Sequence, residues 1–255
     1  MRTVTWNVNS LRARLPRVLQ LLDEHAPDVA LLQETKTAPD TFPTDELAEA
    51  GYAAVHNSGG QWAGVAVLAH SGLTLSEPQL GLPGDTVSHE ARWCEATVHG
   101  IRFASVYVPN GRTLDSPEYP RKLSFLEAMG ARIDELSASD LIVGGDMNIA
   151  PSDLDVYDPA AFVGGTHVSA PEREHLERIL AGGMVDAYRS LHPDEVQYTW
   201  WDYRAGNFHK GLGLRIDLAL VSTPLASRLV SCGIDRDYRK GKKPSDHAPL
   251  LLELA

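Results

Sequence analysis

The chain has 255 residues, of which 43% are hydrophobic, and two cysteines. This length and composition suit one large globular domain, and we expect residues 1–255 to form it. No apolar run is long enough to span a bilayer, and the first residues lack the pattern of a signal peptide. Two cysteines without metal-ligand spacing argue against a disulfide framework and a Cys-ligated zinc site. We therefore expect a protein of the reducing cytoplasm.

The net charge of −11 at pH 7 argues against a nucleic-acid partner when it is taken alone. A local basic patch matters more than net charge, however, and the segment "DRDYRKGKKPSDH" contains one. Such a run is often only a solvated loop, but this one directly precedes Asp246 and His247. Its basic residues are Arg236, Arg239, Lys240, Lys242 and Lys243.

The first segments predict a strand, a helix and a second strand. "RTVTWNVN" is typical of a strand, and Ser10 is suited to cap the helix that follows. Pro27 ends this helix, and "DVALLQE" predicts the next strand. Such crossovers join parallel neighbours, so Asn7 and Glu34 should lie close together at one sheet edge. One apolar helix face is expected at Leu15, Val18, Leu19 and Leu22.

The same pattern recurs in the middle of the chain. Short strands are predicted in "GVAVLAH", "RWCEATVHG" and "IRFASVYVPN", with a hairpin turn at His99 and Gly100. The segment "YPRKLSFLEAMGARIDELSAS" predicts a helix, and "LIVGGDMN" predicts the strand after it. By the same reasoning, Tyr107, Asp146 and Asn148 should share an edge.

The two units resemble each other, which favours two packed sheets with helices outside. Further strands are predicted in "RIDLALVS" and "APLLLELA". We interpret Gly144 and Gly145 as a turn that lets Asp146 and Asn148 face a common site.

Polar residues recur at the ends of the apolar strands. Each one alone is more typical of a turn. Together, several carboxylates in one place repel each other unless a cation neutralises them. Carboxylate and amide ligands without cysteine suit Mg²⁺ or Mn²⁺, and the remaining acids and the histidine would be free for chemistry. The set is Asn7, Glu34, Asp146, Asn148, Asp217, Asp246 and His247.

Seven segments also carry a family resemblance. They are "WNVNSLRAR", "PDVALLQETK", "SVYVPNG", "GGDMNIAP", "YTWWDYRAG", "RIDLALVS" and "SDHAPL". In order and spacing they resemble the exonuclease III family, the bacterial metal-dependent abasic-site endonucleases, from Thr3 to about Leu252. The resemblance implies a four-layered α/β sandwich of two mixed sheets with helices outside. It also implies a monomeric, Mg²⁺- or Mn²⁺-dependent bacterial enzyme of the cytoplasm and nucleoid.

The resemblance implies a metal site around Glu34, the principal carboxylate. Asn7 and Asn9 would support it, and Asp246 would be a further metal-binding or supporting carboxylate. Family members often carry Asp where this chain has Asn9, so metal binding is expected to be weaker or shifted here.

The resemblance also implies catalytic roles. Asp146, oriented by Asn148, would activate the attacking water. His247, held by Asp217, would contact the scissile phosphate. Tyr107 would contact the phosphate as well, and so would Asn110.

The implied substrate is double-stranded DNA with abasic sites or 3′ ends. Trp200, Trp201, Leu214 and Ile216 would line a pocket for a flipped abasic sugar, although two neighbouring Trp residues are also typical of a core. Family members usually have Trp where this chain has Leu214, so 3′-end processing is expected to gain relative to abasic-site incision. The cations expected to touch phosphates are Arg236, Arg239, Lys240, Lys242 and Lys243.

The implied activities are 3′-to-5′ exonuclease, incision 5′ to abasic sites and removal of 3′-phosphates. One alternative is a phosphohydrolase of the same broad fold that acts on inositol lipids or sphingomyelin, or a digestive nuclease. Those relatives usually carry His where this chain has Tyr107. Another is a non-catalytic DNA-binding relative, which should have lost residues of the set Glu34, Asp146, Asn148, Asp217 and His247.

Overall fold

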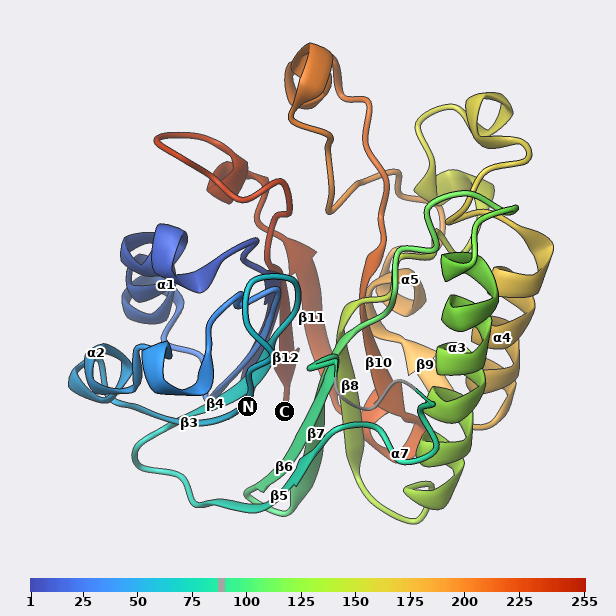
Figure 1. Ribbon diagram of the computed structural model, residues 1–255. Coiled ribbons are helices and arrows are strands. Elements are labelled where there is room, and N and C mark those ends of the chain that lie inside the picture. Colours follow the sequence, from blue (N-terminus) through green and yellow to red (C-terminus); the bar gives the residue numbers. More distant parts are fainter. Residues whose placement is uncertain (87–89) are drawn as a thin grey trace.

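The computed structural model describes residues 1–86 and 90–255 and contains two six-stranded sheets, packed face to face (Figure 1). The first sheet has the order β11-β12-β1-β2-β4-β3, and the second has the order β5-β6-β7-β8-β10-β9. The strands of the first sheet are β1 (Arg2–Asn7), β2 (Val29–Gln33), β3 (Tyr52–Asn57), β4 (Val65–His70), β11 (Leu229–Ile234) and β12 (Leu250–Leu254). Those of the second are β5 (Leu75–Leu80), β6 (Trp93–Val98), β7 (Ile101–Tyr107), β8 (Leu141–Asp146), β9 (Met184–Asp186) and β10 (Asp217–Ser222).

Helices cover the outer face of each sheet. α1 (Leu11–His25) and α2 (Thr44–Glu49) lie on the first sheet, and α3 (Glu118–Glu135) and α4 (Ala170–Ala181) lie on the second (Figure 1). The predicted α/β sandwich is therefore confirmed. Within the described ranges, no helix is long and apolar enough to cross a membrane. Shorter helices are α5 (Ala187–Leu191), α6 (Asn207–Lys210), α7 (Thr223–Ala226) and the 3₁₀ turns η1 (Pro39–Thr41), η2 (Asp153–Asp155), η3 (Pro159–Phe162), η4 (Arg204–Gly206) and η5 (Arg236–Arg239).

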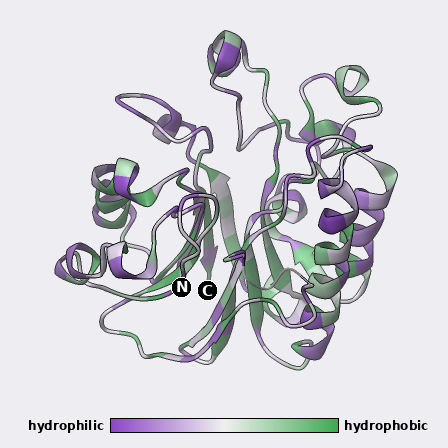
Figure 2. Cartoon of the chain, viewed as in Figure 1, coloured by the Kyte–Doolittle hydropathy of each residue, from purple (hydrophilic) through white to green (hydrophobic). Residues whose placement is uncertain are grey.

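The central strands are apolar on both faces because each face packs on another layer. Leu31 of β2 points into the core between the sheets, while its neighbour Leu32 packs against the α1 side. Ile142 and Val143 of β8 divide in the same way between the central core and the α3 side. Figure 2 shows the result, with hydrophobic strands in the middle and hydrophilic helix surfaces outside. Successive strand residues alternate between faces, so burial of both faces gives an unbroken apolar run.

Strand pairing brings the predicted site residues to one edge. β1 and β2 are parallel with Asn7 opposite Gln33, and β7 and β8 are parallel with Tyr107 opposite Asp146. Both predicted parallel pairs are confirmed. β10 runs antiparallel to β8, so its first residue, Asp217, lies opposite Asp146. An antiparallel strand thus contributes its beginning to the edge where the parallel strands end.

The predicted turn at Gly144 and Gly145 is wrong, because both glycines lie inside β8. A Cβ at Gly145 would stand 1.9 Å from the carbonyl oxygen of Val106, and one at Gly144 would stand 2.7 Å from Leu31. The glycines therefore permit close approach of the neighbouring strand and of the opposite sheet. The turn itself comes two residues after the end of β8, at Asn148, whose φ of 51° is left-handed.

Candidate active site

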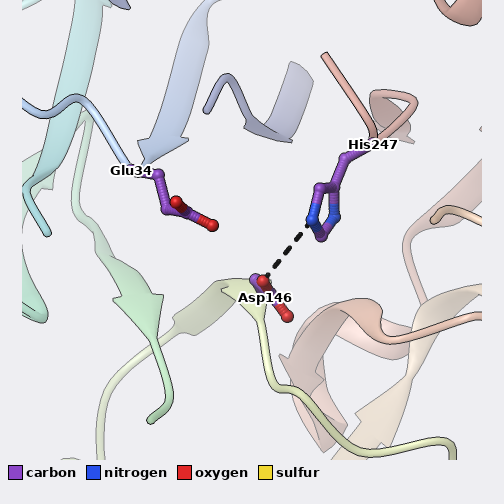
Figure 3. A group of neighbouring side chains, drawn as sticks. All are labelled: Glu34, Asp146 and His247. Carbon is purple, nitrogen blue, oxygen red and sulfur yellow. Dashed lines mark ion pairs between the residues drawn. The ribbon is translucent and has the colours of Figure 1, made fainter. Parts of the chain in front are cut away.

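Glu34, Asp146 and His247 come from different strand ends and point toward one another (Figure 3). Glu34 follows β2, Asp146 ends β8, and His247 lies shortly before β12. One oxygen or nitrogen atom of each lies within 4.8 Å of those of the other two. Asp146 is 2% exposed and His247 3% exposed, whereas the Glu34 side chain keeps 14% of its surface. The cluster is therefore most open on the side of Glu34.

Asn7 holds the two carboxylates of the cluster. Its Nδ2 donates to Glu34 Oε1 at 2.8 Å and to Asp146 Oδ2 at 2.9 Å. Its Oδ1 accepts the backbone N–H of Asn9 at 3.0 Å. This geometry differs from the predicted ligand role, because the amide presents its nitrogen to the carboxylates and its oxygen to the backbone.

Asn9 and Asp246 form a separate pair beside the cluster. Asn9 Nδ2 donates to Asp246 Oδ1 at 2.9 Å, and Trp200 Nε1 donates to Asp246 Oδ2 at 3.1 Å. Lys36, which carries no distinguishing pattern in the sequence, donates to Asn9 Oδ1 at 2.6 Å and pairs with Glu34 at 2.7 Å. The metal-binding roles of Asn9 and Asp246 stay predictions.

His247 lies between two buried carboxylates, and its predicted contact with Asp217 is present. Its Nδ1 lies 2.8 Å from Asp217 Oδ2, and its Nε2 lies 3.7 Å from Asp146 Oδ2. Burial alone would lower the pKa of His247, but the charges of Asp217 and Asp146 outweigh it and raise this pKa to about 10. The two carboxylates therefore favour the imidazolium at neutral pH, in which both ring nitrogens are hydrogen-bond donors.

Asp146 is a carboxylate in a nearly dry environment. Burial raises its pKa to about 7, although the charge of His247 works in the opposite direction. Its Oδ1 accepts the backbone N–H of Asn148 at 2.9 Å, so Asn148 orients it through the main chain. The Asn148 side chain instead donates to the Val108 carbonyl at 2.9 Å and accepts from Asn110 Nδ2 at 3.1 Å.

Tyr107 keeps its proton at neutral pH. Burial, together with the charges of Glu34 and Asp146, raises the pKa of Tyr107 well above its ordinary value. The Arg92 guanidinium lies 4.7 Å from the centre of its ring. A neutral phenol at this edge is a hydrogen-bond donor, as its predicted contact with phosphate requires.

A cavity of about 530 Å³ adjoins Tyr107 and Asn110. Its wall includes Trp62, which is 76% exposed, and the exposed Arg112. An isolated Trp and a single Arg in loop segments carry no pattern in the sequence, so neither was predicted. An exposed indole beside a cation is the combination that stacks on bases and binds phosphate.

The structure buries three of the four members of the predicted apolar wall, whose contact with substrate stays a prediction. Leu214 is 0%, Ile216 2% and Trp201 1% exposed. Leu214 exchanges two backbone hydrogen bonds of 2.9 Å with Trp200, which keeps its side chain in a small buried cluster. Trp200 alone is half-buried, with its ring centre 6.5 Å from that of His247.

The basic loop is only partly a free surface. Arg239 is 5% exposed, and its guanidinium donates to the Ser245 carbonyl and lies 5.3 Å from the ring centre of Tyr203. This cation ties the loop to neighbouring aromatic rings, and its predicted phosphate contact stays a prediction. Lys240 is exposed but pairs with Asp237. The remaining predicted cations, Arg236, Lys242 and Lys243, are exposed.

His167 is a further residue of the site that the sequence did not indicate. Its Nδ1 lies 2.6 Å from the Asn148 carbonyl oxygen, so this nitrogen is the donor. Burial lowers the pKa of His167 to about 4, which leaves the ring neutral with Nε2 as an acceptor. That nitrogen lies 3.5 Å from Asn110 Nδ2. A lone His in a loop has no distinguishing pattern.

The donor atoms of the cluster fit a hard divalent cation. Glu34 and Asp146 offer carboxylate oxygens, and His247 Nδ1 is already engaged by Asp217. One or two carboxylates, with the other positions filled by water or phosphate, is the ligand set that Mg²⁺ prefers.

Comparison with known proteins places this geometry in a family. A sequence model of the Endonuclease/Exonuclease/phosphatase family matches residues 4–247. Exodeoxyribonuclease III of Haemophilus influenzae is 32% identical, and the alignment covers 99% of both chains. A Neisseria 3′ phosphatase bound to a product DNA hairpin is 38% identical over 100% of this chain and 99% of its own, with a TM-score of 0.97. An AP endonuclease from Archaeoglobus fulgidus is 35% identical with the same coverage and a TM-score of 0.95. The chain therefore belongs to the Endonuclease/Exonuclease/phosphatase family and, within it, to the exodeoxyribonuclease III group.

Proposed function

We propose that this protein is a DNA-repair nuclease that hydrolyses phosphate esters in double-stranded DNA with the help of Mg²⁺ or Mn²⁺. The observation that carries the proposal is the convergence of Glu34, Asp146 and His247, with Asp217 behind the histidine. A phosphodiester is itself negative, so its hydrolysis needs positive charge at the phosphate and a base at the water. The cluster supplies both within one edge of the sheets.

The side chains divide the chemistry among them. Glu34 would hold the divalent cation, whose charge favours attack on the phosphate. The His247 imidazolium would donate to a phosphate oxygen from Nε2, and Asp217 would keep its ring in orientation at Nδ1. Asp146, whose pKa of about 7 suits a general base, would accept a proton from the attacking water. Tyr107 would donate its phenolic hydrogen bond to a further phosphate oxygen.

Among the activities of the group, we propose that removal of 3′-phosphates and 3′-terminal nucleotides dominates over abasic-site incision. The similar Neisseria structure is that of a 3′ phosphatase, which supports this choice. The burial of Leu214 and Ile216 supports it too, because these side chains offer no open apolar wall to a flipped sugar. We also propose that the protein acts as a monomer on DNA in the bacterial cytoplasm.

Chelation should abolish the activity. Duplexes of one sequence, carrying a 3′-phosphate, a recessed 3′ end or an internal abasic analogue, would be incubated with Mg²⁺ and then with excess EDTA. We expect the 3′-phosphate duplex to be turned over best, and EDTA to lower every rate at least ~10²-fold. Full activity in EDTA would contradict the proposed metal, and exclusive abasic-site incision would contradict the proposed substrate.

Lys242 and Lys243 should contribute phosphate contacts. For the double variant Lys242→Ala/Lys243→Ala, we expect weaker binding to all duplexes and a salt dependence flatter by about two units of slope, one for each contact. Binding would be measured in EDTA by fluorescence anisotropy at several salt concentrations. Arg2→Gln/Arg228→Gln removes two exposed cations outside the predicted site residues and is the matched control. Equal slopes for both double variants would show that the basic loop does not touch DNA.

A further inference from the structure

Lys122 of α3 and Glu172 of α4 form an ion pair in the interior. Both side chains are 0% exposed, and Lys122 Nζ lies 2.5 Å from Glu172 Oε1. Taking two charges out of water is costly, and well-packed apolar residues of similar volume are often as stable or more so. Stability alone therefore does not account for this pair. The hydrogen bonds that both side chains make to nearby loops indicate a second role.

The ammonium group of Lys122 holds two loops of the active site. Besides Glu172, it donates to the carbonyl oxygen of Asn148 at 2.6 Å and to that of Asn110 at 3.3 Å. These bonds use all three of its hydrogens. Asn148 follows β8 and Asn110 follows β7, so one buried cation fixes the two residues whose amides bond to each other beside Asp146.

Glu172 joins a third loop to the same pair. Its Oε1 accepts the backbone N–H of His167 at 3.0 Å, and its Oε2 accepts the backbone N–H of Ser169 at 3.0 Å at the start of α4. His167 in turn donates from Nδ1 to the Asn148 carbonyl that Lys122 also binds. The carboxylate therefore caps a helix, balances Lys122 and holds the histidine loop in one arrangement.

The loops around the pair carry unfavourable backbone conformations. Asn148 has a φ of 51°, Arg112 of 54° and His167 of 74°, all in the left-handed region, which Arg and His rarely adopt and which Asn tolerates better. Such residues persist when the surrounding structure holds them. Because Lys122 binds the carbonyl of Asn148 directly, its removal frees the left-handed residue that orients Asp146.

We propose that the Lys122–Glu172 ion pair positions Asn148 and Asn110 for the reaction at the phosphate. Lys122 is a positioning residue, since it is fully buried and acts through the two carbonyl groups. This inference rests on the proposed nuclease function. If the pair acts through geometry, its loss should lower kcat even in a variant whose stability is restored.

Two variants test this separation on the 3′-phosphate duplex with Mg²⁺. Lys122→Met leaves Glu172 buried without its cation, so we expect a Tm lower by roughly 10 °C. We expect kcat to fall ~10–100-fold with KM within about threefold, because small misplacements of catalytic groups reduce rate more than binding. Lys122→Met/Glu172→Gln carries no unpaired charge, so Tm should recover toward wild type while kcat stays low.

Arg132→Met is the matched control. Arg132 lies on the same helix, ten residues or about 15 Å further along, and pairs with the buried Glu95. Its loss should lower Tm and leave kcat unchanged. A wild-type kcat in Lys122→Met, or a kcat that recovers together with Tm in the double variant, would overturn the positioning role. An inactive wild type would overturn the proposed function itself, and the positioning role with it.

Discussion

Asp146→Asn should lower kcat at least ~10²-fold while the protein remains folded. The substitution keeps the shape of the side chain and removes the carboxylate that we propose as the base for the attacking water. The loss of charge should not destabilise the metal-free protein at pH 7 and above. Burial raises the pKa of Asp146 to about 7, so its ionised form is less favourable in the folded than in the unfolded state.

The measurement compares kcat on the 3′-phosphate duplex with Tm in EDTA. Asp140→Asn, at the residue just before β8, is a control of the same chemistry outside the cluster, and it should be active. A strong loss of kcat in Asp146→Asn, with a Tm within a few degrees of wild type, would support the role of Asp146 as a general base. Activity within a few-fold of wild type would show that Asp146 only shapes the turn before Asn148.

His247→Gln should lower kcat ~10²–10³-fold, the range for loss of a donor that stabilises developing charge. Gln retains an N–H donor but not the positive charge between Asp217 and Asp146. Asp217 is 0% exposed, so it would be left as a buried carboxylate without its cation, and Tm should fall as well. Asp217→Asn/His247→Gln should recover Tm without recovering kcat.

The pH dependence of stability gives an independent test of the His247 charge. The pKa of His247 is raised from 6.5 to about 10 in the folded protein, so the folded state keeps a proton that the unfolded state releases. The resulting stabilisation is complete below pH 6.5 and is lost as the pH rises toward 10. In EDTA, the Tm of wild type should fall across this window, and the fall should be smaller in His247→Gln. Parallel Tm curves would contradict an imidazolium at this position.

The central strands and the meeting of Asn7 with Glu34 could be predicted from local patterns, because β2 and β8 are buried on both faces and read as unbroken apolar runs. Four strands were not predicted, and all four lie at sheet edges: β3, β5, β9 and β11. An edge strand has a neighbouring strand on one side only, so its other side can face the solvent. The β5 sequence "LSEPQL" accordingly has no buried residue and contains a proline.

By itself the sequence determined the two strand–helix–strand units, the family resemblance and the residues of the cluster of Glu34, Asp146 and His247, since these depend on local periodicity and on motif order. Only the tertiary structure decided which side chains face the solvent. Leu214 and Arg239 are buried by loops distant in sequence, and Gly145 is required by a carbonyl on the neighbouring strand. The role of Lys122 likewise depends on three loops that meet only in the folded chain. Any residue can offer its backbone carbonyl to a lysine, so these hydrogen bonds leave no pattern in the sequence.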